Sequence, residues 1–190
     1  MNLDDEIKHR RAIEALRSGV PNRDAVLALG CTQPEIEEKF RQQLQSAKQG
    51  LVDGSKTYGM LVGGDFGTGK SHLLEYLQHL ALEQNFICSK VVISKETPLY
   101  DPVKLYRAAA EAAIVPGIRS AALTEIATKL NPMSESYKDL YEWVNRPGAD
   151  LNSRFAATLF LFERMPNDQE ARNRIIRFWS GEQIGVAEIK

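Results

Sequence analysis

The sequence predicts an α/β fold with a short parallel βαβ unit at residues 58–115 and extensive helical additions at both ends. Two apolar runs of strand character, Tyr58–Gly63 and Phe86–Ser94, flank Ser71–Gln84, in which leucines recur at helical spacing. Strand, helix and strand in this order imply parallel pairing of the strands and a right-handed crossover through the helix. We therefore expect these residues to form the core of the protein.

Residues 1–57 are predicted to be an N-terminal helical segment that packs on this core. Gly30 is a natural stop for a short helix, and Thr32–Glu35 has the pattern of a capping box with proline in the first turn. From Ile36 onward, apolar residues recur every three or four positions. This spacing predicts an amphipathic helix that closes near Gly50.

Residues 116–190 are predicted to be a second helical region, because proline and glycine clusters divide them into stretches of helical periodicity. These stretches are Ser120–Leu130, Ser134–Val144, Ser153–Met165 and Asp168–Trp179. We find no third core strand and no acidic motif in this region. We therefore expect the chain to be the N-terminal portion of a larger protein.

The composition is that of a folded protein without membrane segments. Hydrophobic residues make up 43% and charged residues 26% of the 190 positions, and the formal net charge is −1, so bulk charge attracts neither nucleic acid nor an acidic membrane. The two cysteines, Cys31 and Cys88, have no metal-ligand spacing and are expected to be reduced thiols. The N-terminus lacks the pattern of a signal peptide, and we expect a cytoplasmic protein.

A glycine-rich turn between the first predicted strand and the helix satisfies the pattern G-x-x-x-x-G-K-[ST] completely. Its residues are Gly64, Asp65, Phe66, Gly67, Thr68, Gly69, Lys70 and Ser71. Ordinary residue frequencies give odds of about one in a hundred that a chain of this length contains it by chance. The strand before the motif and the helix after it are the context that a phosphate-binding loop requires. The sequence therefore predicts the core of a P-loop nucleotide-binding protein.

Each residue type in this loop has a chemical role in binding ATP with Mg²⁺. The glycines allow the backbone to curl around phosphates, with N–H groups pointing inward at the positive end of a helix. Lys70 is expected to bridge the β- and γ-phosphates, and the Ser71 hydroxyl to ligate Mg²⁺. Asp65 and Phe66 are expected to shape the loop. His72 follows in the first helical turn and is expected to pack near the phosphates.

The catalytic residues of a hydrolase remain unknown at this stage. Hydrolysis in P-loop proteins uses a second motif, an apolar strand that ends in acids holding Mg²⁺ and orienting water. Glu96 after the second predicted strand and Glu163 in a helical segment are the two weak candidates. The chain could therefore be an ATPase, a non-catalytic scaffold gated by ATP, or a small-molecule kinase that passes the γ-phosphate to an acceptor.

Three stretches of the sequence, Arg10–Val26, Gly64–Leu77 and Ser89–Pro102, resemble the ATP-binding proteins of bacterial BREX phage-defence systems. The resemblance implies a nucleotide domain similar to AAA+ ATPases of the origin-recognition type, working in an anti-phage complex with other defence proteins. It also implies that Val20–Arg23 lies against the adenine. AAA+ relatives often complete their sites between subunits, so a homo-oligomer is a further expectation. The acidic motif, sensor residues and arginine finger of such proteins cannot be assigned to positions here.

Other candidate features favour structural roles. Asp24–Phe40 has the helix–glycine–helix rhythm of a DNA-binding turn, but Glu35, Glu37 and Glu38 would repel phosphates, so packing helices are favoured. A set of arginines on the last helix could contact DNA or a subunit, although a solvated face is the more common role. This set is Arg172, Arg174 and Arg177. The three histidines, His9, His72 and His79, form no metal-ligand pattern.

Overall fold

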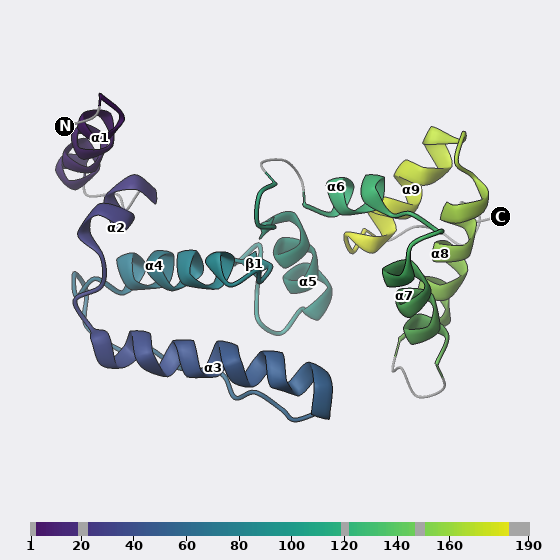
Figure 1. Ribbon diagram of the computed structural model, residues 1–190, viewed down its shortest axis with the longest axis horizontal. Coiled ribbons are helices and arrows are strands. Elements are labelled where there is room, and N and C mark those ends of the chain that lie inside the picture. Colours follow the sequence, from purple (N-terminus) through teal and green to yellow (C-terminus); the bar gives the residue numbers. More distant parts are fainter. Residues whose placement is uncertain (1–2, 19–22, 119–121, 147–150, 183–190) are drawn as a thin grey trace. The chain divides into compact units, whose positions relative to one another are not determined.

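The computed structural model describes residues 3–18, 23–118, 122–146 and 151–182, and these residues are mostly helical (Figure 1). The helices are α1 Leu3–Ser18, α2 Arg23–Leu29, α3 Pro34–Asp53, α4 Lys70–Glu83, α5 Pro102–Glu111, α6 Ala122–Lys129, α7 Glu135–Asn145, α8 Ser153–Arg164 and α9 Gln169–Trp179. The strands are β1 Cys88–Ser89 and β2 Ala113–Ile114. The chain divides into an N-terminal unit, Met1–Phe86, and a C-terminal unit, Ile87–Lys190.

The predicted α/β fold with a parallel βαβ core is wrong. Within the described residues the sheet consists of β1 and β2 alone, and these strands pair antiparallel with Cys88 opposite Ile114. The parallel core of an AAA+-like P-loop protein is therefore not seen. The three-part division at residues 57 and 115 stays a prediction.

The prediction of two paired strands failed because an apolar, extended segment forms a strand only where a backbone partner is available. Tyr58–Gly63 is extended, but it forms no ladder, and Gln43 Nε2 of α3 donates to the Tyr58 carbonyl at 3.0 Å. In the second run only β1 pairs, and Val92 is 73% exposed. Strand pairing depends on backbone partners that are distant in sequence, and a local pattern cannot supply these.

The N-terminal unit is built around the apolar face of α4. Helices α3 and α4 lie side by side and run in the same direction, and the extended segment returns between their ends (Figure 1). Leu73, Leu77 and Leu80 of α4 form the buried centre of this unit. The partly buried residues packed against them are Cys31, Ile36, Phe40, Met60, Val62 and Tyr76. The helical spacing predicted for both segments is thereby confirmed, and one cluster holds both flanks of the glycine-rich turn.

The ends of α3 differ from the sequence prediction by a few residues. Pro34 is in the first turn as predicted, but Gln33 rather than Thr32 is the N-cap, and it makes no side-chain capping bond. The helix continues past Gly50 to Asp53 and stops at Gly54, which has a φ of 74°. Gly50 instead permits the close approach of the Ser55 carbonyl, where a Cβ atom would clash.

A polar group joins α3 to α4 beside the apolar cluster. The Tyr76 hydroxyl donates to Glu37 Oε2 at 3.0 Å, and the Arg41 guanidinium donates to Glu37 Oε1 at 2.7 Å. The hydrogen bond from Arg41 lowers the pKa of Glu37. Burial and the neighbouring Glu37 carboxylate raise the pKa of Tyr76. Glu37 therefore serves helix packing, in agreement with the structural role favoured for Asp24–Phe40.

The helices of the C-terminal unit follow the predicted stretches closely, because their start signals are local. Asp101, Ser134, Asn152 and Asp168 each cap the following helix by accepting a hydrogen bond from a backbone N–H of its first turn. The buried cluster Ala127, Phe162 and Ile175 joins α6, α8 and α9. Trp179 packs against this cluster, with its ring 5.1 Å from that of Phe162.

Two buried polar contacts orient the C-terminal helices. Trp179 Nε1 donates to Thr158 Oγ1 at 2.9 Å, and the Thr158 hydroxyl donates to the Arg154 carbonyl at 2.8 Å. The buried Tyr137 of α7 donates its hydroxyl to Glu163 Oε2 of α8 at 3.2 Å. Burial and the adjacent Glu163 carboxylate raise the pKa of Tyr137 to about 12.

Leu77→Ala is expected to destabilise the N-terminal unit by about 2–4 kcal/mol, because it removes a buried side chain and leaves a cavity in the cluster. Leu77 is 4% exposed, whereas Leu74 on the same helix is 51% exposed. Leu74→Ala is therefore the matched control and should cost well under half as much. Urea unfolding followed by circular dichroism measures both, and equal losses would contradict the placement of the core on this face of α4.

The contribution of Tyr137 to stability is expected to depend on pH at the alkaline end. The pKa of Tyr137 rises from 10.0 to about 12 on folding, so the contribution is complete below pH 10 and is lost as pH increases toward 12. The free energy of unfolding of the wild type should therefore fall toward that of Tyr137→Phe over this window. Urea titrations of both proteins across the window measure the difference, and a difference independent of pH would refute the assignment.

Candidate functional site

The glycine-rich loop Gly64–Ser71 leads directly into α4, which begins at Lys70. Gly67 and Gly69 both have a φ of 82°, in the left-handed region where other residues are strained. Gly69 is the N-cap of α4 and provides no side-chain capping bond. The first turn of the helix therefore begins without the side-chain acceptor that serines or aspartates provide elsewhere.

The Lys70 ammonium closes the loop from inside. Its Nζ atom donates to the Gly64 carbonyl at 2.7 Å and to the Asp65 carbonyl, and it lies 3.4 Å from Thr68 Oγ1. The Asp65 carbonyl also accepts from the Thr68 hydroxyl at 2.8 Å. These bonds draw both ends of the loop around one positive charge, which an anion would meet on entering.

Gly64 has no room for a side chain. A Cβ atom at this position would lie 2.9 Å from Thr68 Oγ1, so a side chain here would displace the Thr68 hydroxyl from its bond to the Asp65 carbonyl. Gly67 and Gly69, in contrast, have open space around them, and their positive φ angles are what require glycine. The three glycines of the motif thus serve two distinct physical needs.

The remaining loop residues point outward. Phe66 is fully exposed at 104%, and Asp65 and Ser71 are also exposed. Asp65 acts through its backbone carbonyl, whereas its carboxylate carries no such contact with Lys70 or Thr68. The exposed Ser71 hydroxyl, one residue beyond Lys70 at the start of α4, is accessible to a ligand.

His72 contacts a different part of the N-terminal unit. Its Nε2 atom lies 2.9 Å from the carbonyl of Gly30, in the turn after α2, so its ring forms a hydrogen bond across 42 positions of sequence. Gly30, with a φ of 65°, ends α2 as predicted. The sequence pattern marked Gly30 only as a helix stop, and no local signal could reveal that its carbonyl anchors α4.

The structure gives other partners to the two weak catalytic candidates. The Glu96 carboxylate accepts from the Ser94 hydroxyl at 2.6 Å, in a turn of the C-terminal unit. Glu163 lies in α8 and accepts from Tyr137. The prediction that this segment is helical is confirmed. The predicted adenine segment Val20–Arg23 lies outside the described residues, apart from the backbone of Arg23.

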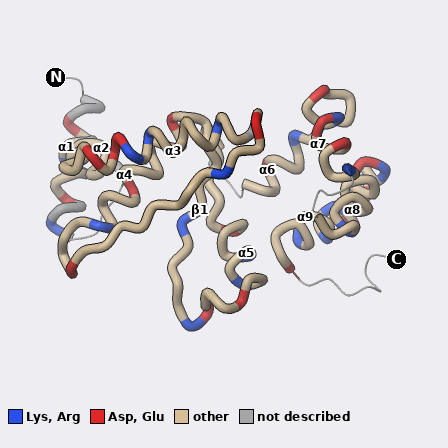
Figure 2. The backbone as a smooth tube through the Cα atoms, turned by 90° about the horizontal axis from the view of Figure 1, so that it is seen from below, with Lys and Arg blue, Asp and Glu red and all other residues tan. Residues whose placement is uncertain are grey.

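The arginines of α9 are engaged within the C-terminal unit. Arg174 pairs with Glu170, Arg177 pairs with Glu182 at 2.6 Å, and Arg172 lies 3.6 Å from the centre of the Phe162 ring. Figure 2 shows basic and acidic residues interspersed along the helices of the described chain. These contacts favour a structural role for the predicted arginine set over contact with DNA.

A turn with left-handed glycines, a lysine at its centre and an uncapped helix behind it is the arrangement of an anion-binding loop. The described residues thus form a helical protein with a glycine-rich loop at the start of α4. A family profile described as BREX system ATP-binding protein BrxC/D matches residues 6–131, about two thirds of the chain. The chain belongs to this family, and the resemblance inferred from the sequence is confirmed.

Beyond the family profile, no curated protein and no solved structure matches the chain. None of the described helices has the length and apolar character required to cross a membrane. Among the described residues, no group of three or more His, Cys, Asp or Glu side chains could hold a metal ion.

Proposed function

We propose that Gly64–Ser71 binds the triphosphate of ATP, and that the chain does so as a component of a BREX phage-defence system. The observation that carries the proposal is the position of Lys70 Nζ, held at the centre of the loop by the carbonyls of Gly64 and Asp65. Membership of a family described as ATP-binding supports ATP as the ligand of this loop.

Lys70 can bind phosphate without leaving the loop. An ammonium group has three donors, and two of them already bond to the Gly64 and Asp65 carbonyls. The third faces Thr68 Oγ1 at 3.4 Å, a long contact that a phosphate oxygen would replace favourably. The loop therefore presents a charge that is already oriented, which reduces the entropic cost of binding.

Backbone N–H groups add to this attraction. The first turn of α4, which begins at Lys70, has no side-chain cap because Gly69 has no side chain. Its N–H groups and the positive end of the helix dipole are thus available to phosphate oxygens. This support requires only a loop and a helix, so the proposal stands without the parallel sheet that the sequence analysis predicted.

Ser71 is the residue proposed to ligate Mg²⁺. Ser71 follows Lys70 in the first turn of α4, and its side chain is exposed. Mg²⁺ usually keeps several waters and takes few protein ligands together with phosphate oxygens, so a single hydroxyl fits its chemistry. The metal would neutralise phosphate charge and fix the orientation of the triphosphate.

We propose that this chain binds ATP, and we assign none of its residues a role in ATP hydrolysis. Glu96 and Glu163 belong to the C-terminal unit and bond to Ser94 and Tyr137. These bonds favour the non-catalytic, ATP-gated scaffold over a chain that hydrolyses ATP alone. We further propose that other defence proteins in the cytoplasm are the partners that respond to the bound nucleotide.

Lys70→Ala is expected to weaken binding of Mg·ATP by roughly 1.5–3 kcal/mol, because it removes a charge-assisted contact with phosphate. Isothermal titration calorimetry of the 190-residue chain measures this change. Lys138→Ala is the control, since Lys138 is an exposed lysine on α7 of the C-terminal unit. Equal affinities of wild type and Lys70→Ala would refute the assignment of the loop.

Ser71→Ala is expected to change the metal dependence of ATP binding selectively. The wild type should bind ATP more tightly with Mg²⁺ than with excess chelator, and the variant should lose most of this difference. Ser71→Thr keeps the hydroxyl and should retain it. A Ser71→Ala variant with a full Mg²⁺ effect would show that Ser71 is not the metal ligand. Phosphate release assayed in parallel distinguishes turnover from binding alone.

A further inference from the structure

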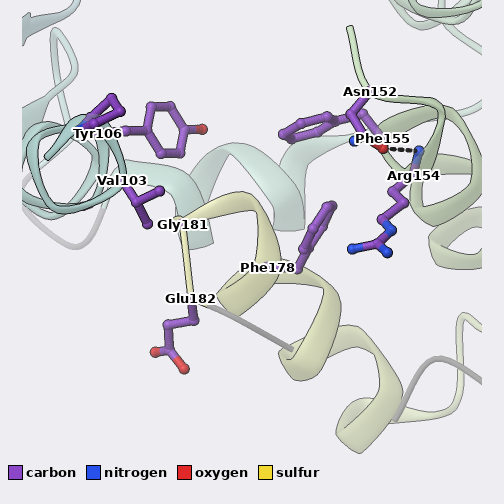
Figure 3. A pocket seen from close by; sticks show the side chains of 9 residues that line it. Val103, Tyr106, Asn152, Arg154, Phe155, Phe178, Gly181 and Glu182 are labelled. Atoms are coloured by element: carbon purple, nitrogen blue, oxygen red, sulfur yellow. Dashed lines mark hydrogen bonds between the residues drawn. The ribbon is translucent and has the colours of Figure 1, made fainter. Parts of the chain in front are cut away.

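The C-terminal unit contains a cavity that the proposed ATP site does not use. It has a volume of about 600 Å³ and lies between the start of α5, the start of α8 and the end of α9. The lining residues are Pro102, Val103, Tyr106, Asn152, Arg154, Phe155, Phe178, Gly181 and Glu182. Figure 3 shows Tyr106 and Val103 on one side of the cavity, and Phe155, Phe178 and Arg154 on the other.

Three aromatic rings form the walls, and local contacts hold them in place. The Tyr106 hydroxyl donates to the Trp179 carbonyl at 2.7 Å. Gly181, with a φ of 88°, packs so closely that a Cβ atom would lie 2.9 Å from the Tyr106 ring. Phe155 and Phe178 form a tilted pair with ring centres 5.1 Å apart. The walls are therefore rigid apolar surfaces that can take a flat ring without reorganisation.

Arg154 gives the cavity a net positive charge. At the far rim, Glu182 is paired with Arg177 at 2.6 Å, and Asp101 beside Pro102 lies 3.9 Å from Lys104. Within the described part of the chain, the exposed Arg154 guanidinium has neither an ion pair nor a hydrogen bond. The charges around the cavity thus cancel in pairs except for Arg154, which leaves a site for an anion.

The position of Arg154 in its helix is also unusual. It is the second residue of α8, next to the positive end of the helix dipole, where a cation is unfavourable. Helix stability therefore does not explain an arginine here. A guanidinium directed over an aromatic cavity is, in contrast, well suited to a phosphate group.

A second cavity in this unit has no charged side chain, among the described residues that line it, that would indicate its ligand. It has a volume of about 650 Å³ and is lined mainly by apolar side chains, with Trp143 and Trp179 among them. The Tyr106 hydroxyl and the Trp179 indole N–H on its wall already donate to other groups. Among the residues that line it, it therefore offers no charged group, and the Trp143 indole N–H alone would not select one ligand.

We propose that the Arg154 cavity binds a nucleobase with its attached phosphate, the base between the aromatic walls and the phosphate on the guanidinium. The volume is within the usual range of roughly 300–1,000 Å³ for small-ligand pockets. Stacking on aromatic side chains is tolerant of base identity, so the site selects nucleotide chemistry rather than sequence. The same group could come from a free nucleotide or from a single-stranded nucleic acid.

The test uses the full chain with Lys70→Ala, which weakens phosphate binding at Gly64–Ser71 and leaves the cavity unchanged. AMP is titrated by calorimetry, and a short fluorescein-labelled oligothymidylate by anisotropy. Arg154→Gln and Phe178→Leu should each weaken binding about tenfold or more. Arg164→Gln, at an exposed arginine of the same helix, is the matched control and should leave binding unchanged. Near-ultraviolet circular dichroism confirms that each variant is folded.

Binding of AMP that depends on Arg154 and Phe178 supports the proposal with a free nucleotide as ligand. Binding of the oligothymidylate alone, with the same dependence, supports it with nucleic acid as the source. Absence of binding to both probes overturns it. Binding that is insensitive to the two cavity substitutions, or equally sensitive to Arg164→Gln, also overturns it. Because the cavity substitutions leave Gly64–Ser71 unchanged, a loss of binding that they cause is attributable to the cavity and not to the proposed ATP site.

Discussion

The packing of α4 against α3 and the extended segment is the constraint on which the candidate site depends. Leu73, Leu77 and Leu80 bury one face of α4, and Met60 and Val62 pack onto that face from the segment just before the loop. Both flanks of Gly64–Ser71 are therefore anchored in one cluster, and the loop must turn sharply within a few residues. Left-handed glycines make that turn possible, and the Lys70 ammonium stabilises it from inside.

Polar contacts then fix the orientation of α4 relative to α3 and to the turn after α2. Glu37 accepts from both Tyr76 and Arg41, which ties α3 to α4, and His72 ties the first turn of α4 to the Gly30 carbonyl. The helix that follows the loop is thus connected to α3 and to the turn after α2.

The C-terminal unit is likewise held together by a buried apolar cluster with polar contacts beside it. Side-chain caps define the starts of α5, α7, α8 and α9, and the Trp179–Thr158 hydrogen bond satisfies polar groups beside the buried cluster. The three arginines of α9 are used in ion pairs or against a ring, whereas Arg154 of α8 lines an aromatic cavity.

The sequence by itself determined the family, the glycine-rich turn before α4 and nearly all of the C-terminal helices, because a motif, a cap and a helical period are local. It did not determine the structure of Tyr58–Gly63: the apolar run predicted a strand, whereas the segment pairs with no strand and exposes Leu61 between the partly buried Met60 and Val62. Only the tertiary structure decided that this segment has no parallel partner and that Cys88 pairs antiparallel with Ile114. It likewise brought Gly30 to His72 and gathered Tyr106, Arg154 and Phe178 around one cavity. The physical reason is that such contacts join positions tens of residues apart, and their partners are chosen by packing rather than by neighbouring residues.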